Sequence, residues 1–191
     1  MQSGIQTSEG CDLTIDLGGN TLKSVGPFVG SEGTQTNALR FVKGSKVTIK
    51  NGTIKTSSPD AAILIQNFAD ELILDNVRLE GAMATQYVLS NNFGNIVIKN
   101  GSVIKAKGGH VAFDAHYGLS SEYDDGVCVE IADASVTITG SVEYTKESGK
   151  SDEDFLAKTH IYIPTGYTLT APEGFEFKAT SDGKKQELVK Q

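Results

Sequence analysis

The feature that most constrains this fold is a short pattern that recurs with a basic unit of about 24 residues, lengthened by insertions in two places. Each copy reads apolar, variable, apolar, polar. Because successive side chains of a strand point to opposite faces, the two apolar positions predict a short strand with one buried face. A repeat of this length indicates structural units that stack on one another. The copies are Leu13-Thr14-Ile15-Asp16, Val47-Thr48-Ile49-Lys50, Leu72-Ile73-Leu74-Asp75, Ile96-Val97-Ile98-Lys99 and Val136-Thr137-Ile138-Thr139.

Two further apolar segments accompany this pattern in each unit. Three strands and three turns per unit predict one rung of a triangular coil, in which rungs about 4.8 Å apart bury each other's apolar faces. We therefore expect an all-β fold, a right-handed single-stranded parallel β-helix (β-solenoid) of about 24 residues per coil. The upstream segments are Leu39–Val42, Ile63–Ile65, Val88–Leu89 and Cys128–Ile131, and the downstream positions are Leu22, Ile54, Leu79, Val103 and Val142.

A family resemblance is carried by Asp12–Leu22 (DLTIDLGGNTL) and Val47–Ile54 (VTIKNGTI). These segments resemble the opening coils of the pectin-lyase-like right-handed β-helix superfamily, and the likeness extends over about residues 3–145. The superfamily includes lyases, hydrolases, adhesins and phage tailspike or fibre proteins. The resemblance therefore implies the fold and leaves the function open.

The character of the chain changes after residue 145. Lys146–Asp154 is polar and charged, as in a loop or linker, and short apolar segments between turns follow it. We expect residues 1–145 to form the β-helix and residues 146–191 to form a linker and a small C-terminal β cap. Such a cap would cover strand edges that an open coil leaves unpaired.

An asparagine follows the repeated pattern in three successive units, at Asn51, Asn76 and Asn100. Asparagine tolerates the left-handed backbone conformation that tight turns require, and stacked amides can hydrogen-bond from one rung to the next. We expect these three residues to form a structural ladder. The alternative is that they bind a ligand.

Residues 108–126 form the largest insertion between repeats and concentrate side chains suited to binding. Loops on a rigid scaffold gather binding residues, and aromatic rings beside carboxylates suit the C–H faces and hydroxyl groups of a sugar. The alternative is that the segment packs against the side of the coil and buries Phe113 and Tyr117. The candidate ligand-binding residues are Phe113, Asp114, His116, Tyr117, Tyr123, Asp124 and Asp125.

No metal or cofactor is expected in this segment. Asp114, Asp124 and Asp125 offer oxygen ligands to Ca²⁺, which takes about six to eight, but no spaced Asp-x-Asp-x-Asp-Gly loop is present. His110 and His116 lack a third histidine that would complete a zinc site.

The enzymes of the superfamily set a stricter test. A pectate-lyase-like enzyme implies calcium-binding carboxylates on stacked strands and a basic proton acceptor. A polygalacturonase-like hydrolase implies clustered aspartates with Gly-His-Gly and Arg-Ile-Lys motifs, and this chain has Gly109-His110-Val111 and no Arg-Ile-Lys. We therefore expect no catalysis. The alternative is a polysaccharide lyase or glycoside hydrolase that uses Asp114, Asp124, Asp125 and His110.

Charge and hydropathy exclude several partners. The net charge is −7 with carboxylates spread along the chain, which excludes the basic surface that nucleic-acid binding needs. The longest apolar runs, such as Ala61–Ile65, are only a few residues long, so we expect no membrane insertion. Residues 1–4 do not resemble a signal sequence. Cys11 and Cys128 fall in distant coils and are expected to be free thiols.

These observations favour a non-catalytic β-solenoid that serves as a structural or adhesive module. The expected setting is a bacterial cell surface, the secreted fraction or a virion, with a glycan or host-surface polysaccharide as partner at residues 108–126. A third hypothesis is a pure assembly protein, because Ile73 and Val97 should face outward and could join copies into a homo-oligomer.

Overall fold

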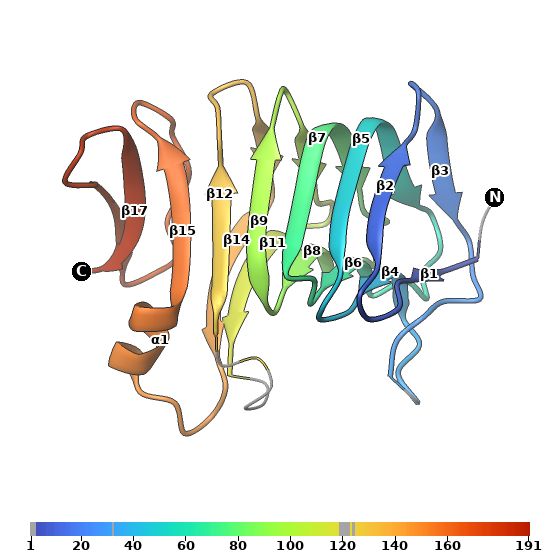
Figure 1. Cartoon of the computed structure of the whole chain (residues 1–191), viewed down its shortest axis with the longest axis horizontal. Helices are drawn as coiled ribbons and strands as arrows, with labels where there is room; N and C mark the ends of the chain where they lie inside the picture. The colour runs from blue at the N-terminus through green and yellow to red at the C-terminus, as the bar shows by residue number, and fades with distance from the viewer. Residues whose placement is uncertain (1–2, 32, 119–122, 124) are drawn as a thin grey trace.

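The computed structural model describes residues 3–31, 33–118, 123 and 125–191, and strands make up most of its regular structure (Figure 1). The expectation of an all-β fold is confirmed. The strands lie side by side along the long axis of the molecule, and the chain advances from one end to the other (Figure 1). Within these segments, no helix has the length and apolar character of a membrane span.

One sheet has six strands in the order β1-β4-β6-β8-β11-β14. Each of these strands pairs in parallel with its neighbours. Since neighbours in the sheet are separated in sequence by strands of the other sheet, the chain alternates between the two sheets. The bounds are β1 Ile5–Gln6, β4 Asn37–Phe41, β6 Ile63–Asn67, β8 Tyr87–Asn91, β11 Val111–Tyr117 and β14 Ser141–Lys146.

The other sheet has eleven strands and includes both ends of the molecule. Its pairs are parallel from β2 to β15, whereas β17 pairs antiparallel with both β15 and β16. The bounds are β2 Asp12–Asp16, β3 Thr21–Ser24, β5 Lys46–Thr56, β7 Glu71–Glu80, β9 Gly94–Lys99, β10 Val103–Lys105, β12 Val127–Ile131, β13 Thr137–Thr139, β15 Thr159–Pro164, β16 Phe175–Ala179 and β17 Lys185–Lys190.

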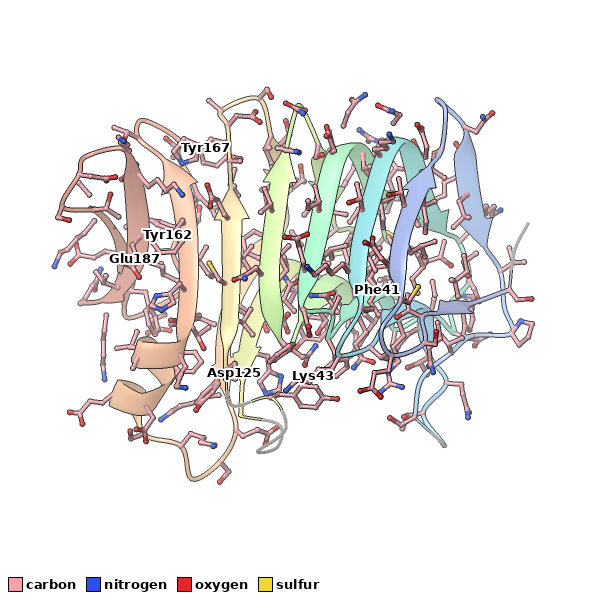
Figure 2. The ribbon with its side chains drawn as sticks, viewed as in Figure 1. Phe41, Lys43, Asp125, Tyr162, Tyr167 and Glu187 are labelled. Carbon is pink, nitrogen blue, oxygen red and sulfur yellow. The ribbon has the colours of Figure 1, made fainter. Side chains whose placement is uncertain are left out.

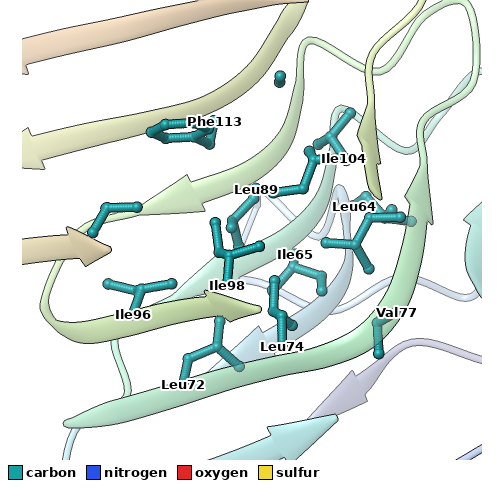
Figure 3. Packing of buried hydrophobic residues seen from close by; sticks show 14 of the residues in the cluster. Leu64, Ile65, Leu72, Leu74, Val77, Leu89, Ile96, Ile98, Ile104 and Phe113 are labelled. Atoms are coloured by element: carbon teal, nitrogen blue, oxygen red, sulfur yellow. The ribbon is translucent and has the colours of Figure 1, made fainter. Parts of the chain in front are cut away.

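The core is a set of aliphatic ladders between the two sheets (Figure 3). Equivalent residues of adjacent strands stand in register, as Val47, Leu72 and Ile96 do in β5, β7 and β9, and each is at most 1% exposed. Full burial of one such side chain stabilises the fold by about 1.5–3 kcal/mol. Strands that would have no buried face alone are therefore stable when stacked.

The expected register is wrong after residue 108. Val129 pairs with Ile96, so Cys128–Ile131 continues the ladder that we expected Val136–Thr139 to continue. Residues 111–117 were expected to be loop, but they form β11, and Phe113 stacks between Leu89 and Val142. The reason is physical: Phe113 and its apolar neighbours fill the core position of that rung, and the segment then has to be a strand.

The third strand of each rung differs from expectation at two positions. Ile104, not Val103, stands in register with Leu79, and Ile138 follows it in β13. Val142 belongs to the six-stranded sheet instead. The first difference follows from alternation, because shifting a strand by one residue moves its side chains to the opposite face. The second follows from the changed register after residue 108, which puts Ile138 in the third strand and Val142 in the next strand of the six-stranded sheet.

The C-terminal segment continues both sheets before it caps them. β14 runs to Lys146, across the expected boundary at residue 145, and β15 still pairs in parallel with β12. The expected linker contains a short helix, α1 (Asp152–Lys158), whose N-cap Ser151 accepts a hydrogen bond from Asp154 N. The β16–β17 hairpin then ends this side of the eleven-stranded sheet, with β16 as the last strand.

The three asparagines occupy left-handed corners, with φ of 57° at Asn51, 53° at Asn76 and 54° at Asn100. Asn76 Nδ2 donates to Asn51 Oδ1 at 3.3 Å, as expected for a ladder. Asn100 Nδ2 instead donates to Asp75 Oδ1 at 2.7 Å. The amide-to-amide bond therefore joins Asn76 to Asn51, whereas Asn100 is held by a carboxylate of the neighbouring strand.

Candidate functional site

A cleft of about 450 Å³ lies at the corner where the chain passes from the six-stranded sheet to the eleven-stranded sheet. We call it the corner cleft. Successive rungs contribute to it through the turns that precede β5, β7, β9 and β12, together with the end of α1 and the start of β15. Its lining includes Lys43, Asp70, Asn95, Asp125, Lys158 and His160.

Three aromatic rings pack beside the corner cleft. The ring centroid of Tyr123 lies 4.8 Å from that of Phe68 and 5.6 Å from that of Phe93. Phe68 and Phe93 are each 5% exposed, whereas Tyr123 is half-buried above them. Aromatic pairs at these separations are attractive beyond the area they bury, so the cluster gives this corner a firm apolar base.

Lys43 joins the aromatic cluster to the acidic side of the cleft. Its Nζ lies 4.5 Å from the centroid of Phe93, within cation–π range, and 4.0 Å from Asp125 Oδ2. Figure 2 shows Lys43 and Asp125 together at the same edge of the molecule. The ammonium group thus lies between the Phe93 ring and the carboxylate of Asp125, which stays exposed to solvent.

The rim of the corner cleft offers both donors and acceptors to solvent. Asp70, Asn95, Asp125 and Lys158 are exposed, and they come from four different turns or strands. An amide donates and accepts, a carboxylate accepts, and an ammonium group donates. This mixture matches hydroxyl groups, each of which donates one hydrogen bond and accepts others.

Next to the cleft, β12, β15 and β17 present a wall of charged side chains that meets the cleft at His160. His160 Nδ1 and Glu187 Oε1 lie 2.6 Å apart, and Lys185 Nζ lies 2.7 Å from Glu130 Oε1. Glu187 occupies one ring nitrogen of His160 and so orients the imidazole toward the cleft. The pairs are partly exposed, so they organise the wall more than they stabilise it.

Burial and neighbouring carboxylates keep two groups of this wall protonated. Burial, then the charge of Glu130, raises the pKa of the Cys128 thiol to about 11. Burial, then the charge of Glu187, raises the pKa of Tyr162 to about 12. Because the thiolate is the nucleophilic form, Cys128 is poorly suited to nucleophilic catalysis near neutral pH. Cys11 and Cys128 are both free, as expected.

The candidate residues of β11 lie away from the corner cleft. Phe113 is fully buried and Tyr117 is 5% exposed, with its ring 6.2 Å from that of Phe155. His116 Nε2 lies 3.4 Å from Glu147 Oε1, and burial lowers the pKa of this histidine. These three side chains serve packing and pairing, as the alternative of a segment packed against the coil proposed.

Asp114 is a buried carboxyl group on the outer side of β11, and it is 3% exposed. Burial raises its pKa to about 7 against the opposing effect of hydrogen bonds from Asn91 N and Ser90 Oγ, and Glu143 on β14 adds to the rise. Tyr87 on β8 reaches across β11 toward β14, where its hydroxyl lies 3.3 Å from Glu143 Oε2. A general acid works best with a pKa near neutral pH, as Asp114 has, but a substrate cannot reach this buried carboxyl group.

The structure therefore brings together only part of the predicted site. Asp125 lines the corner cleft, and Tyr123 lies beside it, packed on Phe93. Asp124 lies outside the described residues, and His110 sits in the turn before β11. Sequence analysis missed Lys43, Phe68 and Phe93. The signal available for the two phenylalanines was an aromatic residue just after the strand that ends in asparagine, in two successive units.

Other site classes find little support in the described part of the chain. It contains no group of three or more His, Cys, Asp or Glu side chains that could hold a metal ion. Ile73 and Val97 pair in register on the outer face, half-buried, and a contact between copies there stays a prediction.

No family model matches this chain, and no curated protein or solved structure shows significant similarity to it. Its function is therefore argued from the geometry and chemistry of its own residues.

Proposed function

We propose that this chain is a right-handed parallel β-helix that binds a glycan in the corner cleft and leaves it uncleaved. The observation that carries the proposal is the cleft itself, in which exposed hydrogen-bonding groups from successive rungs lie next to a cluster of packed aromatic rings, with Phe93 of that cluster in the lining. The proposal places this module on a bacterial surface or virion, where adhesion to glycans is useful.

The β-helix part of the proposal is supported by the pairing register. Val47 pairs with Leu72 and Leu72 with Ile96, so one turn of the chain returns to the same sheet after about 24 residues. Crossover connections between parallel strands of one sheet are right-handed in about 98% of cases. The same arrangement supports the resemblance to the pectin-lyase-like superfamily.

The glycan part of the proposal is supported by size and chemistry. Ligand pockets usually span about 300–1,000 Å³, and the corner cleft falls in this range. Asn95 and Lys158 can donate to sugar hydroxyl groups, and Asp70 can accept from them. Among the described residues of the aromatic cluster, Tyr123 is the most accessible ring, and it packs on Phe93 beside the cleft, so a sugar that extends past Phe93 would contact this ring.

The carbohydrate-active enzyme is the weaker alternative on this geometry. Glycoside hydrolysis uses two carboxyl groups on either side of the scissile bond, one of them with a raised pKa. The carboxyl group with the raised pKa is Asp114, which is buried, and Asp125 is paired with Lys43 at the corner cleft. These two aspartates do not face a common space.

A glycan array tests the proposal, with bound protein and released oligosaccharide measured in the same wells. We expect binding without release. Lys158→Ala should weaken the affinity for the bound glycan about 10-fold, since a charge-assisted hydrogen bond contributes about 1.5–3 kcal/mol. Lys184→Ala removes the same charge from the exposed turn before β17, and we expect it to leave the affinity unchanged.

Two outcomes would contradict the proposal. Equal affinities for the wild type, Lys158→Ala and Lys184→Ala would place the glycan elsewhere on the molecule. Release of oligosaccharide that persists in purified Asp125→Asn and Asp114→Asn variants would establish catalysis by other residues, and loss of release in either variant would favour the enzyme.

A further inference from the structure

The strands β2 and β3 form an open edge of the eleven-stranded sheet. Within the described chain, each of them pairs with β5 and with no other strand (Figure 1). The opposite end of this sheet is formed by the β16–β17 hairpin, whose strand β16 is the edge there. A strand edge with unpaired N–H and C=O groups is a template for another strand.

The backbone geometry shows which groups of β2 face away from β5. Leu17 N donates to Lys50 O, and Cys11 O accepts from Lys46 N. In a parallel strand the N–H and C=O groups of successive residues point to alternate sides, so the odd-numbered residues of β2 face β5. The N–H and C=O of Thr14 therefore face the open edge.

The apolar core is also incomplete at this edge. Leu13, Ile15 and Leu22 are only half-buried. Their counterparts one rung further, Val47, Ile49 and Ile54, are at most 1% exposed. A strand laid against β2 would give these three side chains the cover that every later rung receives from its neighbour, and burial of apolar area is favourable at about 25 cal/mol per Å².

The other sheet is covered at this end by the chain itself. Gly4 N donates to Pro27 O at 2.7 Å, and Val29 pairs with Asn37. This segment runs beside β1 and β4. The part of the end that stays open is therefore the β2–β3 edge.

Charge defines what this edge can accept. Outward positions alternate in sign along the sheet, from Asp16 to Lys50, Asp75 and Lys99, and the ammonium groups of Lys50 and Lys99 each lie 3.5 Å from a carboxylate of the adjacent strand. Asp12 stands beside Lys46 in the same way. If this alternation continues, a strand that pairs with the open edge of β2 should carry a basic residue opposite Asp12 and another opposite Asp16.

The same charges oppose pairing between two copies of this edge. A two-fold pairing of β2 with β2 of another copy places Asp12 near Asp16, and a parallel pairing places each aspartate beside itself. Like charges directly opposite each other destabilise a strand pair. The edge is thus protected against its own copy while it stays open to a basic strand.

We propose that the β2–β3 edge binds a strand of another polypeptide with the pattern basic, apolar, variable, apolar, basic. The strand runs parallel to β2, its two apolar residues cover Leu13 and Ile15, and its basic residues meet Asp12 and Asp16. Binding by strand addition derives its affinity from main-chain hydrogen bonds and its specificity from alternate side chains.

A peptide with the sequence of residues 46–56, KVTIKNGTIKT, is the probe, because β5 precedes β7 in the relation that the probe would have to β2, with Lys46 and Lys50 in register with Glu71 and Asp75. The matched control peptide, EVTIENGTIET, keeps the apolar residues and reverses the charges. Fluorescence anisotropy with the full chain at low salt should show the lysine peptide binding at least about 10-fold more tightly than the glutamate peptide.

Two variants of the protein separate the contribution of main-chain hydrogen bonds to peptide binding from the contribution of charge. Thr14→Pro removes the donor that faces the open edge, keeps the bonds from β2 to β5, and should abolish binding of the lysine peptide. Asp12→Asn with Asp16→Asn should remove the preference between the two peptides. Asp60→Asn, in an exposed turn, is the control and should bind as the wild type does. Thermal unfolding by circular dichroism checks that each variant is folded.

Several results would overturn the proposal. Failure of the lysine peptide to bind the wild type up to millimolar concentration is one, and equal binding of both peptides is another. Light scattering that shows self-association of the wild type, removed by Thr14→Pro, would identify a second copy as the occupant instead. The glycan array is independent of each of these outcomes.

Discussion

The backbone amide of Asn91 donates to the carboxylate of Asp114 at 2.7 Å across neighbouring strands of the six-stranded sheet. Asn91 Nδ2 also donates to Asp114, to its backbone carbonyl oxygen at 2.8 Å. The side chain of Asp114 is thus tied into the sheet at a site that is 3% exposed. Burial outweighs its hydrogen bonds and raises its pKa to about 7.

This carboxyl group should make the stability of the fold decrease as pH rises from about 4 to about 7. Over that range the folded state retains a proton that the unfolded state, with its ordinary pKa near 3.8, has lost. The free energy of unfolding should therefore fall by up to about 1.4 kcal/mol per pH unit. Asp114→Asn should lack this contribution and should be more stable than the wild type at pH 8.

Urea unfolding of both proteins at several pH values measures the difference. Asp60→Asn removes an exposed carboxyl group and should follow the wild type. Glu143 and Tyr87 face Asp114 from the adjacent strands, so Glu143→Gln should shift the falling limb to lower pH by lowering the pKa of Asp114. Parallel curves for the wild type and Asp114→Asn would contradict the assignment.

Replacing Phe113 tests whether residues 111–117 are core or binding loop. Phe113→Ala should lower the free energy of unfolding by about 3–5 kcal/mol, because the ring is fully buried and leaves a cavity. Met83→Ala also shortens an apolar side chain, but Met83 is 66% exposed and the change should stay within about 0.5 kcal/mol. Chemical denaturation gives both values. Similarly small effects of the two substitutions would contradict a buried position for Phe113.

The left-handed corner at Asn76 predicts a difference between two small substitutions. Asn76→Ala should cost about 1–2 kcal/mol, because a Cβ without a compensating side-chain bond is unfavourable at positive φ. Asn76→Gly adopts this conformation without strain and should cost less, although it loses the bond to Asn51. Thermal unfolding ranks the variants. An alanine variant as stable as the glycine variant would mean that φ is not what selects asparagine here.

The ladder through Val47, Leu72 and Ile96 could be predicted from sequence because its cause is local. Alternation of apolar residues sets which face of each strand is buried, and an even spacing of the copies sets which strands meet. The asparagine corners could be predicted for the same reason, since a tight turn after each strand requires a residue that tolerates positive φ.

The rung that contains β11, β12 and β13 could not be predicted in this way. Val129 and Val136 both begin an apolar, variable, apolar segment, and the chain between units is longer there. Only packing decides which of the two continues the ladder from Ile96, because the answer depends on Phe113 filling the core position beside Leu89.

By itself, the sequence determined that this protein is built from short stacked strands with apolar residues on one face. The tertiary structure determined the corner cleft, where Lys43, Phe93 and Asp125 come from three different rungs. It also decided that Asp114 is buried and that β2 is left with an open, acidic edge. The physical reason is that alternation is a property of neighbouring residues, whereas burial, pKa and a shared cleft depend on which distant segments pack together.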